Sequence, residues 1–144
     1  MNIAIGSDAA GELPDSVERW LKRRGHIVTR VGATQTGDDR PWPSVARDVA
    51  ERVARGEADY AVLCCWTGTG VSIAANKVPG VRAALCGDAQ TAAGAREWND
   101  ANVLCLSLRA TSPAVAEEML DAWFASKPTS DPVYREMIDE VRTL

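Results

Sequence analysis

Histidine is nearly absent from this 144-residue chain, which contains only His26. Four cysteines are present, but no two have Cys-x-x-Cys spacing, so the usual ligand set of a zinc site is missing. Cys64 and Cys65 are adjacent, which is not typical of a disulfide framework. We therefore expect free thiols, with Cys64, Cys86 and Cys105 as small buried side chains. No metal or other cofactor is predicted.

Long apolar runs and clusters of basic residues are also lacking. No run approaches the length of a membrane span, and the first residues do not form a signal-type segment. The net charge is −4, the pI is near 5.0 and the basic residues are dispersed, which argues against a nucleic-acid partner. The chain is expected to be cytoplasmic, with no membrane partner. Its length and its 46% hydrophobic content predict a single domain over residues 1–144.

Apolar strand-like runs alternate with helical patterns along the whole chain. The expected strands are Asn2–Gly6, Ile27–Val31, Tyr60–Cys65, Val81–Cys86 and Asn102–Ser107. The expected helices cover about 11–24, 44–55, 71–77, 89–97, 113–126 and 132–142. This alternation predicts an α/β fold: a single-domain, Rossmann-like three-layer sandwich with a five-stranded parallel sheet and helices on both faces. The expected strand order is 2-1-3-4-5.

In this strand order, ligands bind where the winding direction reverses, at the carboxyl ends of the first and third strands. Those ends carry Gly6–Gly11 and the turn Cys65–Gly70, which are rich in reactive and small residues. The topology and the residue types therefore indicate the same candidate site.

Asp8 follows the first strand, where a dinucleotide fingerprint would have its second glycine, and a carboxylate beside a pyrophosphate is unfavourable. Two interpretations remain open for Asp8: it caps the following helix, or it contacts a substrate hydroxyl.

Cys65 ends the third strand just before a helix, whose N–H groups and dipole favour a thiolate. Nucleophilic cysteines usually work with a histidine, and none is evident here, so a general base is the better interpretation. The glycine-rich turn lacks the Gly-Lys-Ser/Thr ending of a nucleotide P-loop, and a plain strand-to-helix turn remains an alternative.

Four stretches resemble the type B ribose-5-phosphate isomerase family, which also contains the galactose-6-phosphate isomerase subunits. They are Ile5–Asp8 with Gly11, Cys65–Lys77, Pro79–Ala83, and Asn99–Leu104 with Arg109. The resemblance covers nearly the whole chain. It implies interconversion of phosphorylated aldoses and ketoses through a cis-enediolate, without metal or nucleotide.

The resemblance also implies roles for individual residues. Cys65 would be the base that moves a proton between C1 and C2, Thr67 would help to move the hydroxyl proton, and Asp8 would contact a substrate hydroxyl. Backbone amides of the turn would stabilise the enediolate oxygen. The binding set implied is Ser7, Gly68, Thr69, Gly70, Val71, Ser72, Trp98, Asn99, Arg109 and Arg135.

Three of these residues, Asn99, Arg109 and Arg135, match positions that reach into the neighbouring subunit's site in the family's dimer, where the arginines serve the phosphate. The resemblance thus implies a homodimer with two shared sites, and leaves open whether dimers pair into tetramers.

The chain departs from the family pattern at four positions. Ala9 and Trp98 stand where the family has histidines, one of which opens a furanose ring by acid–base catalysis. Asp131 replaces a phosphate arginine, and Trp66 replaces a glycine beside the base. These changes favour a short or acyclic substrate such as a tetrulose phosphate. The alternatives are a ribose-5-phosphate isomerase, an isomerase of another small sugar, and a non-catalytic binding or partner subunit.

Overall fold

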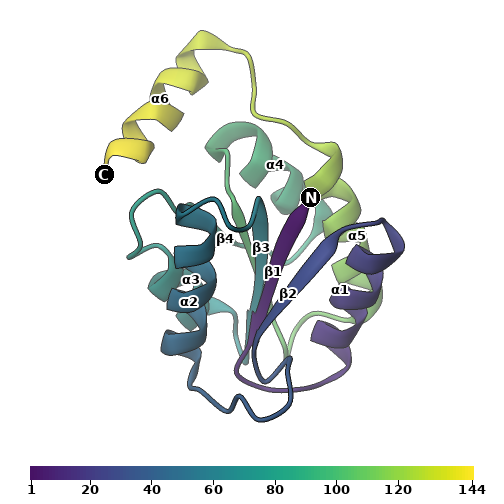
Figure 1. The fold of residues 1–144 in the computed structure, drawn as a ribbon. Helices are drawn as coiled ribbons and strands as arrows, with labels where there is room; N and C mark the ends of the chain where they lie inside the picture. The colour runs from purple at the N-terminus through teal and green to yellow at the C-terminus, as the bar shows by residue number, and fades with distance from the viewer.

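The computed structural model describes residues 1–144, with five parallel strands that form one sheet between helical layers (Figure 1). The strands are β1 (Asn2–Ser7), β2 (Ile27–Gly32), β3 (Tyr60–Cys65), β4 (Ala83–Leu85) and β5 (Val103–Ser107). The helices are α1 (Glu12–Arg23), α2 (Trp42–Ala54), α3 (Thr69–Ala75), α4 (Ala89–Asn99), α5 (Pro113–Ala125) and α6 (Pro132–Thr143). The predicted fold class is confirmed.

Each face of the sheet has its own apolar core, because successive strand residues point to opposite sides. Ile3, Ile5 and Cys64 pack with residues of α1, α4 and α5. Ala4 and Cys65 pack with residues of α2 and α3 on the other face. The two adjacent cysteines therefore serve different sides of the sheet, as the alternation predicts.

The strand order is β2-β1-β3-β5-β4, so the predicted order was wrong for the last two strands. All five residues of Val103–Ser107 are buried, as suits a central strand with neighbours on both sides. Ala83–Leu85 is only three residues long and partly exposed, as suits an edge strand. The difference in burial thus fits a central position for β5 and an edge position for β4. In this order the end of β5 lies beside the end of β3, with Ser107 opposite Cys65.

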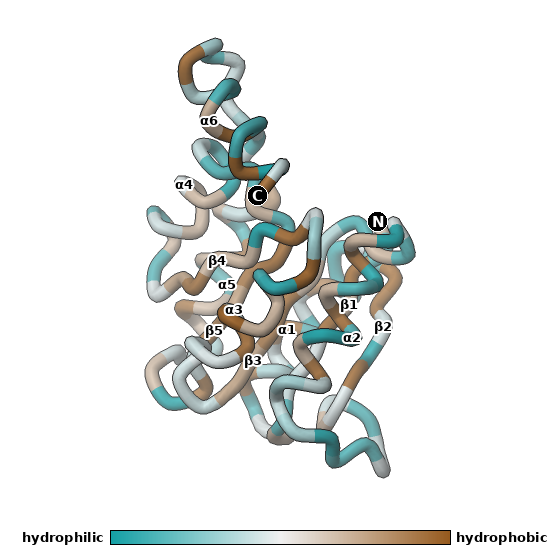
Figure 2. Tube along the Cα trace, turned by 90° about the vertical axis from the view of Figure 1, so that its left-hand side faces the viewer, coloured by the Kyte–Doolittle hydropathy of each residue, from teal (hydrophilic) through white to brown (hydrophobic).

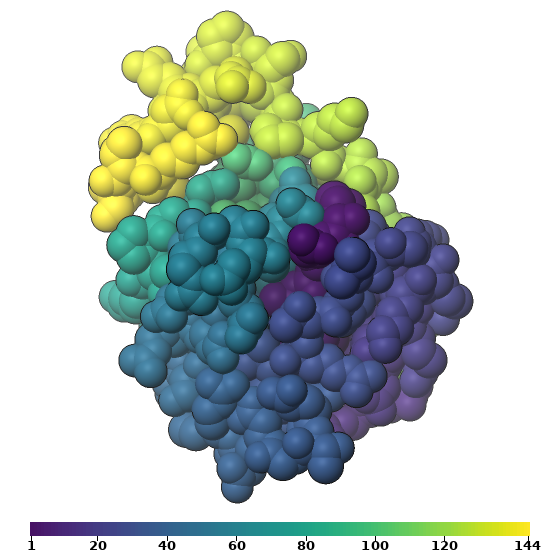
Figure 3. Space-filling model, in the orientation of Figure 1, coloured from purple at the N-terminus to yellow at the C-terminus, as the bar shows by residue number.

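The last helix, α6, stands clear of the two layers, above the end of the sheet where β1 begins (Figures 1 and 3). It packs mainly against α4, and Ile138 is its only buried residue. Hydrophobic residues nevertheless recur along it (Figure 2). None of the helices combines the length and apolar character needed to cross a membrane.

Candidate active site

The carboxyl ends of β1 and β3 lie side by side at the lower edge of the sheet in Figure 1, where Ser7 is opposite Cys64. Cys65 follows at this edge and is 5% exposed. Burial raises the pKa of the Cys64 thiol to about 12, and the nearby Cys65 and Asp8 add to the effect. Cys64 is therefore a protonated core residue, and Cys65 is the cysteine that ends at the predicted site.

The turn after β1 excludes helix capping as the role of Asp8. Helix α1 has Gly11 at its N-cap and no side-chain cap. Ser7 closes the turn itself: its Oγ donates to the carbonyl of Ala9 (2.7 Å) and accepts from the Ala9 N–H (3.2 Å). The Oδ1 atom of Asp8 is buried and has no hydrogen-bond partner. Buried carboxylate oxygens normally have partners, so this atom is suited to accept a hydrogen bond from a bound hydroxyl.

The turn after Cys65 requires glycine at position 68. Gly68 has φ of 75°, and a Cβ atom there would lie 2.9 Å from the carbonyl carbon of Leu106. Its N–H donates to the Cys65 carbonyl (3.2 Å), and its own carbonyl accepts from the Ser72 N–H (3.2 Å). Since Ser72 donates this first helical bond, the amides of Thr69, Gly70 and Val71 precede the hydrogen-bonded part of α3.

Two hydroxyl groups lie together on the exposed side of this turn. The Oγ1 atoms of Thr67 and Thr69 are 2.7 Å apart, within hydrogen-bonding distance. This pair can relay a proton, since each hydroxyl both donates and accepts. The turn therefore presents a thiol, a hydroxyl pair and several backbone N–H groups within a few residues.

Trp66 and Arg109 are joined through the backbone at the same edge. The Trp66 carbonyl accepts from the Arg109 N–H (3.1 Å) and from Ser107 Oγ (3.0 Å), while the indole is 67% exposed. Arg109 thus begins beside the Cys65 turn of its own chain. That Arg109 reaches the site of a neighbouring subunit stays a prediction.

Three predicted site residues are not brought to this edge. Trp98 and Asn99 end α4, just before β5 begins, and Arg135 lies on α6 at that same end of the sheet. Asp131 accepts from the Val133 N–H (2.9 Å) and is the N-cap of α6. Its carboxylate therefore has a structural role in this chain.

Two further residues support the site, although the sequence suggested no role for them. The Trp42 ring packs on Gly70, so that a Cβ atom at Gly70 would lie 3.1 Å from it. Asn76 joins α3 to β4: its Nδ2 donates to the Ala83 carbonyl and its Oδ1 accepts from the Ala83 N–H, both at 2.8 Å. Neither contact has a local sequence signal beyond the prolines that flank Trp42, because both depend on the tertiary fold.

The comparisons with known proteins identify the family. Residues 3–140 match the model of the Ribose/Galactose Isomerase family. The chain belongs to that family. It is 38% identical to a D-erythrulose-4-phosphate isomerase from Pectobacterium atrosepticum, over 85% of this chain and 82% of the relative. It is also 38% identical to ribose-5-phosphate isomerase B from Escherichia coli, over 87% and 84% of the two chains.

The solved structures give the same result for the fold. Ribose-5-phosphate isomerase B of Clostridium thermocellum superposes with a TM-score of 0.90 at 35% identity, over 99% of this chain and 96% of that one. The prediction of an enzyme of the sugar-phosphate isomerase type is confirmed by family membership. No group of three or more His, Cys, Asp or Glu side chains is arranged to hold a metal ion.

Proposed function

We propose that this protein interconverts an aldose and a ketose of a short phosphorylated sugar through a cis-enediolate, with Cys65 as the base. The observation that carries the proposal is the meeting of Cys65, the Thr69–Val71 amides and the unpartnered Asp8 Oδ1 atom at one edge of the sheet. A base, an acceptor for a substrate hydroxyl and donors for an oxyanion are the groups that this reaction needs.

The proposed reaction is a proton shift with no net oxidation. The Cys65 thiolate removes a proton from the carbon next to the carbonyl, and the released electron pair forms the carbon–carbon double bond of the enediolate. The thiol then returns the proton to the former carbonyl carbon. Meanwhile the hydroxyl proton passes between the two oxygens, with Thr67 and its neighbour Thr69 as the relay. The amides of Thr69, Gly70 and Val71, which make no bond within the turn, stabilise the charged oxygen.

The absence of histidine at the site favours a substrate that needs no ring opening. His26, the single histidine, is partly buried and stacked against Trp20 and Phe124, away from the site. A ketose of four carbons with phosphate on O4 cannot close a furanose, so it arrives open. The relative named D-erythrulose-4-phosphate isomerase supports this choice. The alternative is ribose 5-phosphate, supported by the Escherichia coli relative, with ring opening left to solution.

The deciding experiment compares erythrulose 4-phosphate with ribose 5-phosphate in deuterated water and follows turnover and carbon-bound deuterium by NMR. Turnover and exchange with the four-carbon substrate alone would support the proposal. Efficient turnover of ribose 5-phosphate would select the alternative. Cys65→Ala should abolish both signals while substrate binding remains, and unchanged turnover in this variant would remove Cys65 as the base.

We also propose that the protein is a homodimer in which each site is completed by Trp98, Asn99 and Arg135 of a second copy. These residues lie at the end of the sheet opposite Cys65 of their own chain, so they cannot serve that site from within it. Helix α6 carries exposed apolar side chains that a second copy would cover. They are Val133, Tyr134, Met137 and Val141.

Mixing two inactive variants tests this shared site. Cys65→Ala and Arg135→Ala should each be inactive alone, because every site then lacks either its base or its phosphate ligand. After dissociation and random reassembly, half of the dimers are mixed and each mixed dimer has one intact site. Activity should return to about a quarter of the wild-type value. No recovery from verified mixed dimers would mean that Cys65 and Arg135 of the same chain form each site, which would overturn the shared site.

A further inference from the structure

We propose that Trp42 is a positioning residue of the active site, which holds the Gly68–Ser72 turn in the shape that binds the enediolate oxygen. The inference rests on the proposed function for what the turn binds, and on contacts in the structure for how it is held. Trp42 is the first residue of α2 and is 38% exposed. A methyl group at Gly70 would lie 3.1 Å from two carbons of its ring, closer than side chains normally pack. The ring therefore lies directly on the backbone of the turn.

The segment that carries Trp42 is fixed to the end of β1. Ala33 follows β2, and its N–H donates to the carbonyl of Ser7 (2.7 Å), the residue before Asp8. Gly32 has φ of 70°, and any Cβ atom there would collide with the same carbonyl. The connection between β2 and α2 thus starts in contact with one half of the site and ends, at Trp42, in contact with the other half.

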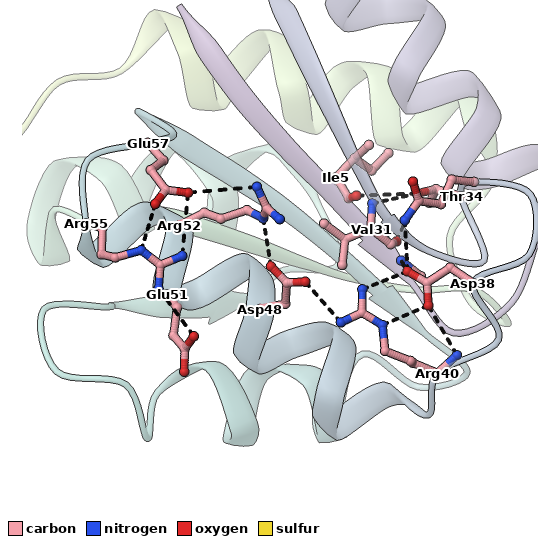
Figure 4. Close-up of polar contacts among 12 residues, drawn as sticks. Ile5, Val31, Thr34, Asp38, Arg40, Asp48, Glu51, Arg52, Arg55 and Glu57 are labelled. Carbon is pink, nitrogen blue, oxygen red and sulfur yellow. Dashed lines mark hydrogen bonds and ion pairs between the residues drawn. The ribbon is translucent and has the colours of Figure 1, made fainter.

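An ion-pair cluster holds this connection along its length (Figure 4). Asp38 accepts from the Gly32 N–H (2.7 Å) and from Gln35 Nε2 (2.9 Å). It also binds Arg40 through Nε (2.8 Å) and a terminal nitrogen (2.7 Å), and Arg40 in turn reaches Asp48 on α2 (3.0 Å). We call Asp38, Arg40 and Asp48 the loop clamp. It ties the segment to the helix that begins with Trp42.

The charges of the loop clamp are stable over a wide pH range. Hydrogen bonds from Arg40 and Gln35 hold the pKa of Asp38 well below its usual value. Burial alone would raise the pKa of Asp48, but hydrogen bonds from Arg52 and Arg40 outweigh it and lower the pKa. Both carboxylates therefore stay ionised where an isomerase of this kind would be assayed, and the clamp needs no ligand to form.

A double-mutant cycle tests whether Trp42 acts through Gly70. Trp42→Ala should lower kcat about tenfold, because small displacements of catalytic donors are costly, while Trp42→Phe keeps a ring on the turn and should stay within about threefold. Gly70→Ala should cost about tenfold in the wild type but less than about twofold when Trp42 is already alanine, since its added methyl group then meets no ring. Independent, multiplying losses would overturn the proposal.

Two arginine variants test the loop clamp. Arg40→Ala should reproduce the kcat loss of Trp42→Ala. Arg55→Ala is the matched control, because Arg55 also binds two carboxylates, Glu57 and Glu51, but at the far end of α2. Its kcat should equal that of the wild type. Equal kcat values for the two arginine variants would remove the clamp from the proposal.

Amide hydrogen exchange separates this inference from the proposed function. Gly68 and Ser72 donate backbone hydrogen bonds inside the turn, and their exchange can be followed by NMR without any substrate. Trp42→Ala should speed both about tenfold at an unchanged unfolding midpoint, and Trp42→Phe should not. A wild-type protein without turnover would refute the isomerase, whereas unaltered exchange in Trp42→Ala would refute the positioning role.

Discussion

All four cysteines are buried, and Cys65 is the one that lies at the candidate site, where β3 ends. The pKa of Cys86 is raised to about 12, chiefly by burial and also by the charge of Asp88. Burial raises the pKa of Cys105 far above its usual value, with the neighbouring thiols Cys64 and Cys86 adding to it. Burial raises the pKa of the Cys64 thiol in the same way. Since the thiolate is the reactive form, these three side chains are inert in the folded protein.

Alkylation of the native protein should therefore modify Cys65 alone. Iodoacetamide treatment followed by peptide mass spectrometry is expected to find one labelled cysteine before unfolding and four after it. A saturating sugar phosphate should slow the single reaction, because it would cover the edge of the sheet where Cys65 ends. Cys65→Ala should take up no label while folded. Native labelling at Cys64, Cys86 or Cys105 would contradict the assignment.

At the scale of elements, Asn76 compensates for the shortness of β4. A strand of three residues has few ladder hydrogen bonds, and Asn76 adds two more at Ala83 while its Nδ2 also donates to the Ser72 carbonyl (3.0 Å). One side chain thus joins the start of β4 to α3, whose first residues form the candidate site.

Asn76→Ala should lower the free energy of unfolding by about 1–2 kcal/mol, because backbone groups of Ala83 lose their partners. Urea denaturation followed by circular dichroism measures this loss. Lys77→Ala is the matched control: Lys77 is the next residue, is exposed and makes no ion pair. If both variants unfold at the same urea concentration, the Asn76 hydrogen bonds contribute nothing to stability.

The sequence predicted the strands and helices but not the order of the last two strands. Val81–Cys86 and Asn102–Ser107 look alike as apolar runs, so hydrophobicity alone could not decide which of them is central. The difference lies in details that only the fold makes visible: Arg82 donates to the Asn102 side chain (2.8 Å), and Val103–Ser107 is buried throughout. The periodicity of a sequence can locate a strand, whereas the identity of its neighbouring strands in the sheet depends on long-range packing.

For the molecule as a whole, the sequence predicted one half of the site better than the other. Asp8 and the Cys65 turn follow strands that meet at one edge, so a general rule of parallel sheets brings them together. Trp98, Asn99 and Arg135 lie beyond that rule, because within one chain they fall at the opposite edge. The contact of Trp42 with Gly70 depends on a connection between β2 and α2 whose path is set by side-chain pairing, and no spacing in the sequence encodes it.

Acid should weaken the whole fold in two separate pH windows. Burial, the charged N-terminus and Arg24 lower the pKa of His26 below its usual 6.5. Between the two values the unfolded chain binds more protons than the folded one, so stability falls as the pH drops below about 6.5. Asp100 behaves differently: burial alone would raise its pKa, but hydrogen bonds from Arg142 and Arg96 outweigh it and lower the pKa. The stability that the ionised Asp100 contributes is therefore fully present above its usual pKa of 3.8, and it is lost only as the pH falls below that value.

His26→Gln should therefore remove the pH dependence of the upper window and keep that of the lower one. The free energy of unfolding, measured in urea between about pH 5.5 and 7.5, should rise with pH in the wild type by no more than about 1.4 kcal/mol per pH unit, the limit for one proton. In the variant it should be flat over this range. Glu57→Gln is the surface control, because the hydrogen bond from Arg55 lowers the pKa of Glu57 and keeps it ionised in this range. This variant should show the same rise of unfolding free energy with pH as the wild type. The chain has no second histidine. If the free energy of unfolding still rises with pH in His26→Gln, a group other than a histidine causes the upper window.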